Sequence, residues 1–261
     1  MGRIAAVDYR EVLFSSLFPG AQTSAVALPP LLEAFERLVP FSFCNRQRIL
    51  LRMDAGFGTD NNLTWVLPRG YQLLVKGFSA SRAAAHARRI TNWTEIRPND
   101  TWIAWSPKPL VFVRPTRTAV VRWRTPKRDR HALYITTLTE LSLHELAELY
   151  DDRGQIEVEI QSDKMGLLIA RRRKRQFAAQ EMLILLNDWV HNFLAWFHAA
   201  ILVDSPFATF GPKRIVRDLF TIPGEATIVN DSLLELRLSE AHPYAAAMVT
   251  CLNRLWQSPH L

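Results

Sequence analysis

The sequence predicts an α/β fold in which helices flank a mixed sheet. One observation behind this prediction is that strand-length apolar runs alternate with helical patterns over residues 10–90. A second is composition: the 261 residues are 48% hydrophobic and 22% charged, as in a globular protein with a sizeable core. A third is that proline and glycine separate the apolar runs, as turns between elements require.

The first elements follow from these patterns in chain order. A strand is expected at residues 10–15, and a helix at residues 28–39 with Pro29 and Pro30 in its first turn, where proline is tolerated. The apolar run at residues 49–53 has the length of a buried strand.

Asp54 directly follows that run. A further strand at residues 71–75 and a basic helix at residues 81–90 continue the alternation. In α/β sheets, ligands bind beyond the carboxyl ends of strands, and Asp54 occupies such an end. The alternative is an aspartate that caps the turn before Gly56.

The middle of the chain is rich in β-type residues and prolines. It predicts a β-rich insertion, followed by a strand that returns to the core and by a helix that Ser142 and Glu145 begin as a capping box. The expected strands are residues 102–105, 110–113, 118–123 and, in the core, 131–136.

Residues 178–203 form the longest apolar stretch. Polar side chains recur in it at helical spacing and would be costly in a bilayer, so it predicts an amphipathic, mostly buried helix and not a membrane span. A hairpin at residues 227–238 and a terminal helix at residues 245–256 are expected to follow. Cys44 and Cys251 have no metal spacing and indicate a reducing compartment.

Tyr150, Arg153, Glu157 and Lys164 are the most specific feature. Steps of three, four and seven residues place them on one face of a helix or of a kinked helix pair. A carboxylate among a guanidinium, an ammonium and a phenol suits a phosphodiester held by metal ions. Singly, Arg153 and Glu157 could form an i,i+4 ion pair, and Tyr150 could be a core residue. The neighbouring acids are interpreted as solvated: Asp60, Asp151, Asp152, Glu159 and Asp163.

Basic side chains are concentrated after this motif. The net charge of +7 favours a polyanionic partner, of which nucleic acid is the commonest. The basic run is either a solvated face or a phosphate-contacting surface, and comprises Arg171, Arg172, Arg173, Lys174 and Arg175. Tryptophans and arginines also mix in the β-rich insertion, where base stacking and cross-strand packing remain equal alternatives.

The spacing, with Asp54 upstream, resembles insertion-sequence transposases of the DDE class, in the branch with a Tyr-x2-Arg-x3-Glu-x6-Lys signature. The resemblance implies a ribonuclease-H-like core whose Asp-Asp-Glu triad holds two Mg²⁺ or Mn²⁺ ions. Asp54 matches the second aspartate and Glu157 the glutamate, so both are the expected catalytic metal ligands. Tyr150, Arg153 and Lys164 match the positions that contact DNA phosphates.

The first aspartate of the family and the core strand that carries it have no counterpart, which implies a chain that lacks its N-terminal part and is inactive alone. The expected segments are residues 1–98 (first part of the core), 99–130 (β-rich insertion), 131–205 (second part of the core) and 206–261 (C-terminal extension).

The resemblance further implies DNA-mediated transposition, with metal-dependent strand cleavage and strand transfer at transposon ends. It implies double-stranded DNA as partner, both transposon ends and target, a homodimer in the synaptic complex, and a prokaryotic cytoplasm with the nucleoid as location. The alternative is a DNA-binding remnant without catalysis.

Overall fold

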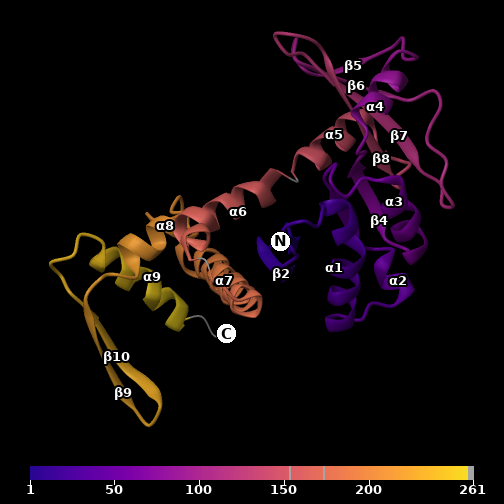
Figure 1. The fold of residues 1–261 in the computed structure, drawn as a ribbon. Coiled ribbons are helices and arrows are strands. Elements are labelled where there is room, and N and C mark those ends of the chain that lie inside the picture. The colour runs from indigo at the N-terminus through magenta and orange to yellow at the C-terminus, as the bar shows by residue number, and fades with distance from the viewer. Residues whose placement is uncertain (153, 173, 258–261) are drawn as a thin grey trace. The chain divides into compact units, whose positions relative to one another are not determined.

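The computed structural model of the protein describes residues 1–152, 154–172 and 174–257. The chain divides into two compact units (Figure 1). Unit 1 contains residues 1–3 and 16–155, and unit 2 contains residues 4–15 and the chain from residue 156 onward. None of the helices in these described residues has both the length and the apolar character needed to cross a bilayer.

Unit 1 is built around a six-stranded mixed sheet with the order β3-β4-β8-β7-β6-β5. β3 and β4 are parallel, and all other neighbours are antiparallel. This mixed sheet with flanking helices is consistent with the predicted ribonuclease-H-like fold. The elements are α1 (Ser24–Leu38), α2 (Phe43–Arg46), β3 (Leu50–Met53), α3 (Asp60–Val66), η1 (Leu67–Arg69), β4 (Gln72–Lys76), α4 (Ala80–Ala87), β5 (Thr94–Arg97), β6 (Thr101–Trp105), β7 (Arg117–Trp123), β8 (Arg130–Thr136) and α5 (Leu143–Asp151).

Helices cover both faces of this sheet. Since successive strand residues point to opposite faces, Val120 packs with Ala83 of α4, whereas Val121 packs with Leu146 of α5. The capping box of Ser142 and Glu145 at the start of α5 is confirmed. Among the described residues, no strand pairs with the outer edge of β3.

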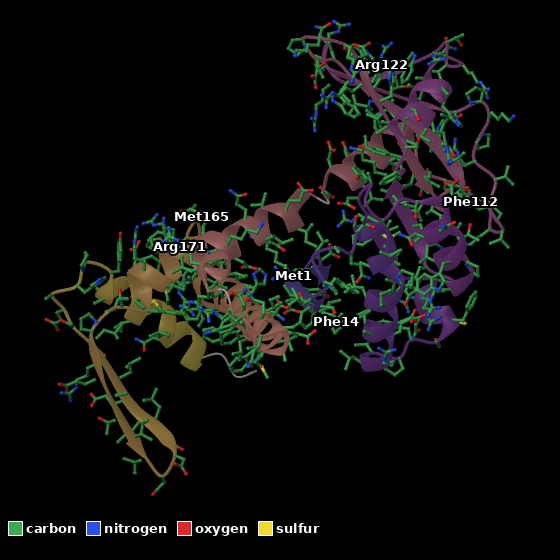
Figure 2. The ribbon with its side chains drawn as sticks, viewed as in Figure 1. Met1, Phe14, Phe112, Arg122, Met165 and Arg171 are labelled. Atoms are coloured by element: carbon green, nitrogen blue, oxygen red, sulfur yellow. The ribbon has the colours of Figure 1, made fainter. Side chains whose placement is uncertain are left out.

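The predicted insertion is part of the same sheet, because β5, β6 and β7 continue it beyond β8. The strand predicted at residues 110–113 is wrong. Pro109 and Pro115 restrict that backbone, and its valines are exposed, Val111 to 91%. These residues, including Phe112 in Figure 2, form a loop between β6 and β7. The division of the chain into four segments stays a prediction.

Helix α1 begins at Ser24, four residues earlier than predicted, so Pro29 and Pro30 lie inside it instead of in its first turn. Ala27 and Leu28 are both buried. The apolar face of the helix therefore starts earlier than the prolines suggested, and its burial compensates for the two missing N–H donors.

A buried carboxylate, Glu36, ties α1 to the start of β4. It accepts hydrogen bonds from the Tyr71 hydroxyl at 2.7 Å and from the Arg69 guanidinium, and Arg46 lies 3.5 Å away. Burial by itself would raise the pKa of Glu36. The hydrogen bonds from Arg69 and Tyr71 and the charges of Arg69 and Arg46 outweigh burial and hold this pKa below its ordinary value.

Unit 2 is mainly helical. Its elements include β2 (Glu11–Ser16), which pairs with β1 (Gly2–Ala6), then α6 (Gly154–Gly166), η2 (Ile169–Arg171), α7 (Phe177–Phe197), the π-helical turn η3 (His198–Leu202), α8 (Pro212–Arg214), the π-helical turn η4 (Ile215–Leu219), the hairpin β9 (Gly224–Val229) and β10 (Ser232–Leu238), and α9 (Ala245–Gln257). The hairpin and the terminal helix confirm the predictions for residues 227–238 and 245–256.

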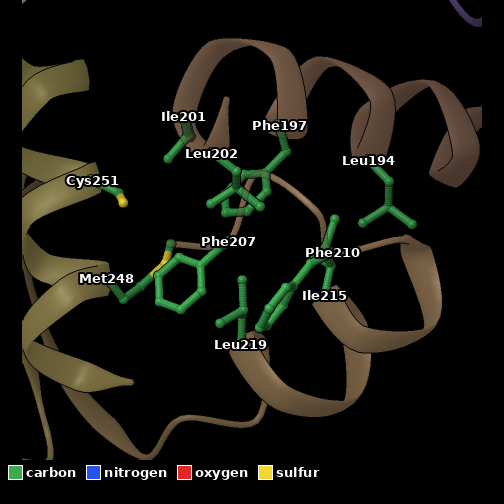
Figure 3. Close-up of a cluster of buried hydrophobic side chains, with 10 residues drawn as sticks. All are labelled: Leu194, Phe197, Ile201, Leu202, Phe207, Phe210, Ile215, Leu219, Met248 and Cys251. Atoms are coloured by element: carbon green, nitrogen blue, oxygen red, sulfur yellow. The ribbon is translucent and has the colours of Figure 1, made fainter. Parts of the chain in front are cut away.

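The core of unit 2 lies between the end of α7, the turns η3 and η4, and α9. Figure 3 shows Phe207 pointing into this space beside Met248. Phe207 also packs edge-on against Phe210, with ring centres 5.2 Å apart. The prediction that residues 178–203 are mostly buried is wrong, because this core contacts one face of α7. The other face exposes large apolar side chains, with Leu186 at 52% and Trp189 at 74%.

Two polar side chains of α7 hold β2 in unit 2. The Asn192 amide donates to the Val12 carbonyl at 2.9 Å and accepts from the Val12 N–H at 2.8 Å. His191 bonds the Arg10 carbonyl at 2.9 Å and Asp163 of α6 at 2.7 Å. The prediction that Asp163 is solvated is wrong: its exposure is 0%, because it is buried beside His191.

We expect Glu36→Gln to lower the stability of unit 1 near neutral pH, because it replaces an anion held by two arginines. Since the folded pKa of Glu36 is depressed, its contribution is present above the ordinary pKa of 4.5 and is lost as pH falls through the folded value. Urea unfolding midpoints should therefore differ most at neutral pH and converge below about pH 4.5. A gap that stays constant with pH would contradict this role of the carboxylate.

We expect Asn192→Ala to destabilise the docking of β2 by about 2–3 kcal/mol, because it leaves a buried N–H and a buried C=O of Val12 without partners. Hydrogen exchange of the Val12 amide measures this directly and should accelerate. Asn187→Ala is the matched control, since the Asn187 side chain is also buried on α7 but its Nδ2 has no hydrogen-bond partner among the described residues. Equal protection of the Val12 amide from hydrogen exchange in both variants would show that Asn192 does not hold β2.

Candidate functional site

Asp54 lies where β3 ends, as predicted. Its Oδ1 accepts a hydrogen bond from the Phe57 N–H at 3.4 Å, so it also caps the following turn. The side chain is exposed. The turn-capping role considered from the sequence is therefore present, and it engages one carboxylate oxygen while the residue remains accessible.

Lys76 occupies the equivalent position at the end of β4, because Met53 pairs with Val75 in parallel register. The two loops that follow are pressed together: Phe78 N–H donates to the Gly58 carbonyl at 2.9 Å. A Cβ at Gly58 would lie 1.9 Å from the Lys76 carbonyl oxygen, so glycine is required there. A carboxylate and an ammonium group thus end adjacent strands.

Sequence reasoning missed Lys76. A signal was available, since Lys76 follows an apolar strand-length run directly, as Asp54 does. Arg52 was also missed. It donates to the Leu149 carbonyl at 2.9 Å and lies 3.8 Å from the Asp152 carboxylate, which fastens the end of α5 to β3.

Tyr150 lies on α5 beside the strand that bears Lys76. It is buried, and its ring stacks on Tyr134 with centres 4.1 Å apart. Lys76, Trp123 and Tyr150 are among the residues that line a hollow of about 290 Å³ on this face. Tyr150 therefore has the core role that the sequence left open. It also lines the same hollow as Lys76 and Arg97, the two cations among the described lining residues.

The second half of the signature lies on α6. Glu157 and Lys164 are both exposed and stand seven residues apart on one helix, so they share a face, about 10 Å apart along the axis. α5 ends at Asp151 and α6 begins at Gly154. The signature is thus divided between two helices, and Arg153 lies outside the described residues.

The predicted basic run follows α6 in unit 2. Arg171, Arg172, Lys174 and Arg175 are exposed, and Arg173 lies outside the described residues. Among the described residues, no carboxylate comes within ion-pair distance of these four cations.

The end of α6 packs closely against α8. A Cβ at Gly166 would lie 2.9 Å from the Lys213 backbone nitrogen, so the two elements are in contact. Lys213 is exposed and adds a further cation at the end of the helix that carries Lys164. No sequence pattern pointed to this residue.

The candidate acids belong to different units: Asp54 to unit 1 and Glu157 to unit 2. Within the described residues, no three His, Cys, Asp or Glu side chains are grouped so that they could hold a metal ion. Each unit by itself therefore offers fewer donors at these positions than a site for two metals requires.

Comparison with known proteins identifies the family of the chain. No curated protein matches the chain. Residues 9–260 match the family model described as transposase DDE domain group 1, so the match covers nearly the whole sequence. The chain belongs to the DDE transposase domain family.

Proposed function

We propose that the protein binds double-stranded DNA and belongs to the machinery of DNA-mediated transposition of an insertion sequence. The observation that carries this proposal is Asp54 at the carboxyl end of β3, with Lys76 at the equivalent end of β4, in a chain of the DDE family. DDE transposases act on DNA and generally use divalent metal ions. The net charge of +7 supports a polyanionic partner.

Asp54 and Glu157 are the two acids that we assign to the metal site, which would take Mg²⁺ or Mn²⁺. Bound metal ions would activate the attacking oxygen and stabilise the leaving oxygen in strand cleavage and strand transfer at transposon ends. Both residues are exposed to solvent. This assignment requires the two units to bring the acids together.

The remaining signature residues would grip the DNA backbone. Lys164 shares a helix face with Glu157, and Arg153 and Tyr150 precede it in the signature of the Tyr-Arg-Glu-Lys branch, to which we assign the chain. The basic run from Arg171 to Arg175 would add sequence-independent phosphate contacts. We further propose a homodimer that pairs two DNA ends, acting on the nucleoid in a prokaryotic cytoplasm.

The resemblance assigns only two of the three family acids to this chain, so we expect the isolated chain to cleave DNA poorly. The alternative function is a DNA-binding protein without catalysis. The structural roles of two candidate residues favour it: Asp54 caps a turn and Tyr150 stacks in the core. These structural roles of Asp54 and Tyr150 do not depend on catalysis.

We expect Asp54→Asn and Glu157→Gln each to weaken Mn²⁺ binding by about tenfold or more, because each removes one anionic ligand. Titration of the full chain with Mn²⁺, followed by the electron paramagnetic resonance of the free ion, measures this without an activity assay. Glu235→Gln is the control, since Glu235 is an exposed acid on β10. Unchanged Mn²⁺ affinity in both acid variants would show that Asp54 and Glu157 are not metal ligands.

We expect nicking of supercoiled plasmid with Mg²⁺ to remain at background for the wild type and for Glu157→Ala, while both proteins still bind duplex DNA. The reason is the shortage of one carboxylate at the metal site. Gel shift and nicking are measured on the same samples. Mg²⁺-dependent nicking by the wild type that Glu157→Ala abolishes would establish a complete enzyme and contradict this expectation.

A further inference from the structure

Two tryptophans and two arginines of unit 1 form an alternating stack, which we call the Trp–Arg ladder. It consists of Trp93, Arg122, Trp102 and Arg124. The guanidinium carbon of Arg122 lies 4.6 Å from the Trp93 ring centre and 4.7 Å from the Trp102 ring centre. That of Arg124 lies 5.1 Å from the Trp102 ring centre. Each distance is within the range of a cation–π interaction.

Strand pairing produces the ladder. Trp102 of β6 pairs with Arg122 of β7 in antiparallel register, so the two side chains leave the sheet on the same face. Ala104 and Val120, two residues further along these strands, pair on that face too, and Val120 packs against α4. The ladder therefore extends the α4 face of the sheet. Arg122 is labelled in Figure 2.

The positive charge of the ladder is poorly neutralised. The Nε of Arg122 is buried and has no hydrogen-bond partner among the described residues, and the nearest carboxylate oxygen, of Asp129, is 3.9 Å away. Residues 122–130, which lead from β7 into β8, contain five basic side chains and one acidic side chain. This end of the sheet thus presents concentrated positive charge on a pair of antiparallel strands.

We propose that the Trp–Arg ladder and the adjoining basic turn at residues 124–130 bind the phosphate backbone of duplex DNA, and that the indole rings orient the arginines instead of stacking on bases. This inference rests on the proposed DNA-binding function. A guanidinium that lies over an indole ring can still donate its N–H groups to phosphate, which it contacts in a fixed fork geometry. Backbone contacts position a protein on DNA without reading its sequence.

The contacts that the indole rings already make favour binding of the DNA backbone over stacking on DNA bases. Trp102 is already in contact with two guanidinium groups and Trp93 with one. A base that stacks on a ring face occupied by a guanidinium would displace that arginine and lose its cation–π interaction, and Trp93 also packs against the cluster of Ala83, Val120 and Leu133. The ladder therefore suits paired DNA, whose bases are not exposed, better than single strands.

The first test is the salt dependence of binding to an arbitrary duplex by the full chain. The double variant Arg122→Gln/Arg124→Gln should reduce the slope of log Kobs against log salt by about 2, and weaken binding by roughly tenfold or more at low salt. Arg37→Gln/Arg237→Gln is the matched control, with the same change in net charge at exposed arginines of α1 and β10. Equal slopes for the two double variants would overturn the inference.

The second test separates orientation from stacking. Trp102→Leu should weaken duplex binding several-fold with an unchanged salt slope, and Trp102→Phe should restore most of the affinity, since phenylalanine still offers a ring to arginine. Unfolding midpoints of both variants check that the sheet is intact. A loss of affinity for oligo-dT that exceeds the loss for duplex would show base stacking and overturn the inference.

The wild-type protein distinguishes the two levels of failure. If it binds no duplex at any salt concentration, the proposed function itself is wrong. If it binds duplex with a steep salt dependence and the ladder variants match their control, the function stands and the ladder is structural only.

Discussion

The parallel register of β3 and β4 is the constraint on which the candidate chemistry of unit 1 depends. Parallel strands end at the same edge of a sheet, so the pairing of Met53 with Val75 brings Asp54 and Lys76 together without any contact between their side chains being needed. The close approach of Gly58 to the Lys76 carbonyl keeps the two strand ends in place. Arg52 then fixes the end of α5 beside them.

Unit 2 depends on a different kind of interaction, a buried polar network at His191. Nε2 faces the Arg10 carbonyl oxygen and Nδ1 faces the Asp163 carboxylate. Since a carbonyl oxygen only accepts, Nε2 carries a proton, and a second proton is shared between Nδ1 and the carboxylate. The network joins the helix that carries Glu157 and Lys164 to α7 and to β2. The orientation of the signature helix within unit 2 thus depends on residues outside the signature.

The sequence predicted what local patterns determine. The strands around residues 49–53, 118–123 and 131–136, the capping box at Ser142 and the hairpin near residue 230 are confirmed, because periodicity and turn chemistry act over a few residues. The strand predicted at residues 110–113 is wrong because apolar residues alone indicated it, and flanking prolines prevent it.

The candidate site was predictable in part. Asp54 at a strand end follows from local pattern. The burial of Asp163 does not follow from local pattern. Its partner His191 is 28 positions away, and His191 in turn bonds the Arg10 carbonyl, 181 positions from it. The two faces of α7 were likewise undetermined, because an apolar sequence does not reveal which of its sides the core of Phe197 and Phe207 will contact.

The Trp–Arg ladder has a consequence for conformational entropy. A free arginine side chain carries about 2 kcal/mol of rotamer entropy, which a flexible basic surface loses at the moment of binding. In Arg122, which is held between two indole rings, most of that loss has already occurred during folding. The entropy cost of ordering the Arg122 side chain is thus met by the folding free energy of the sheet, and not by the free energy of ligand binding.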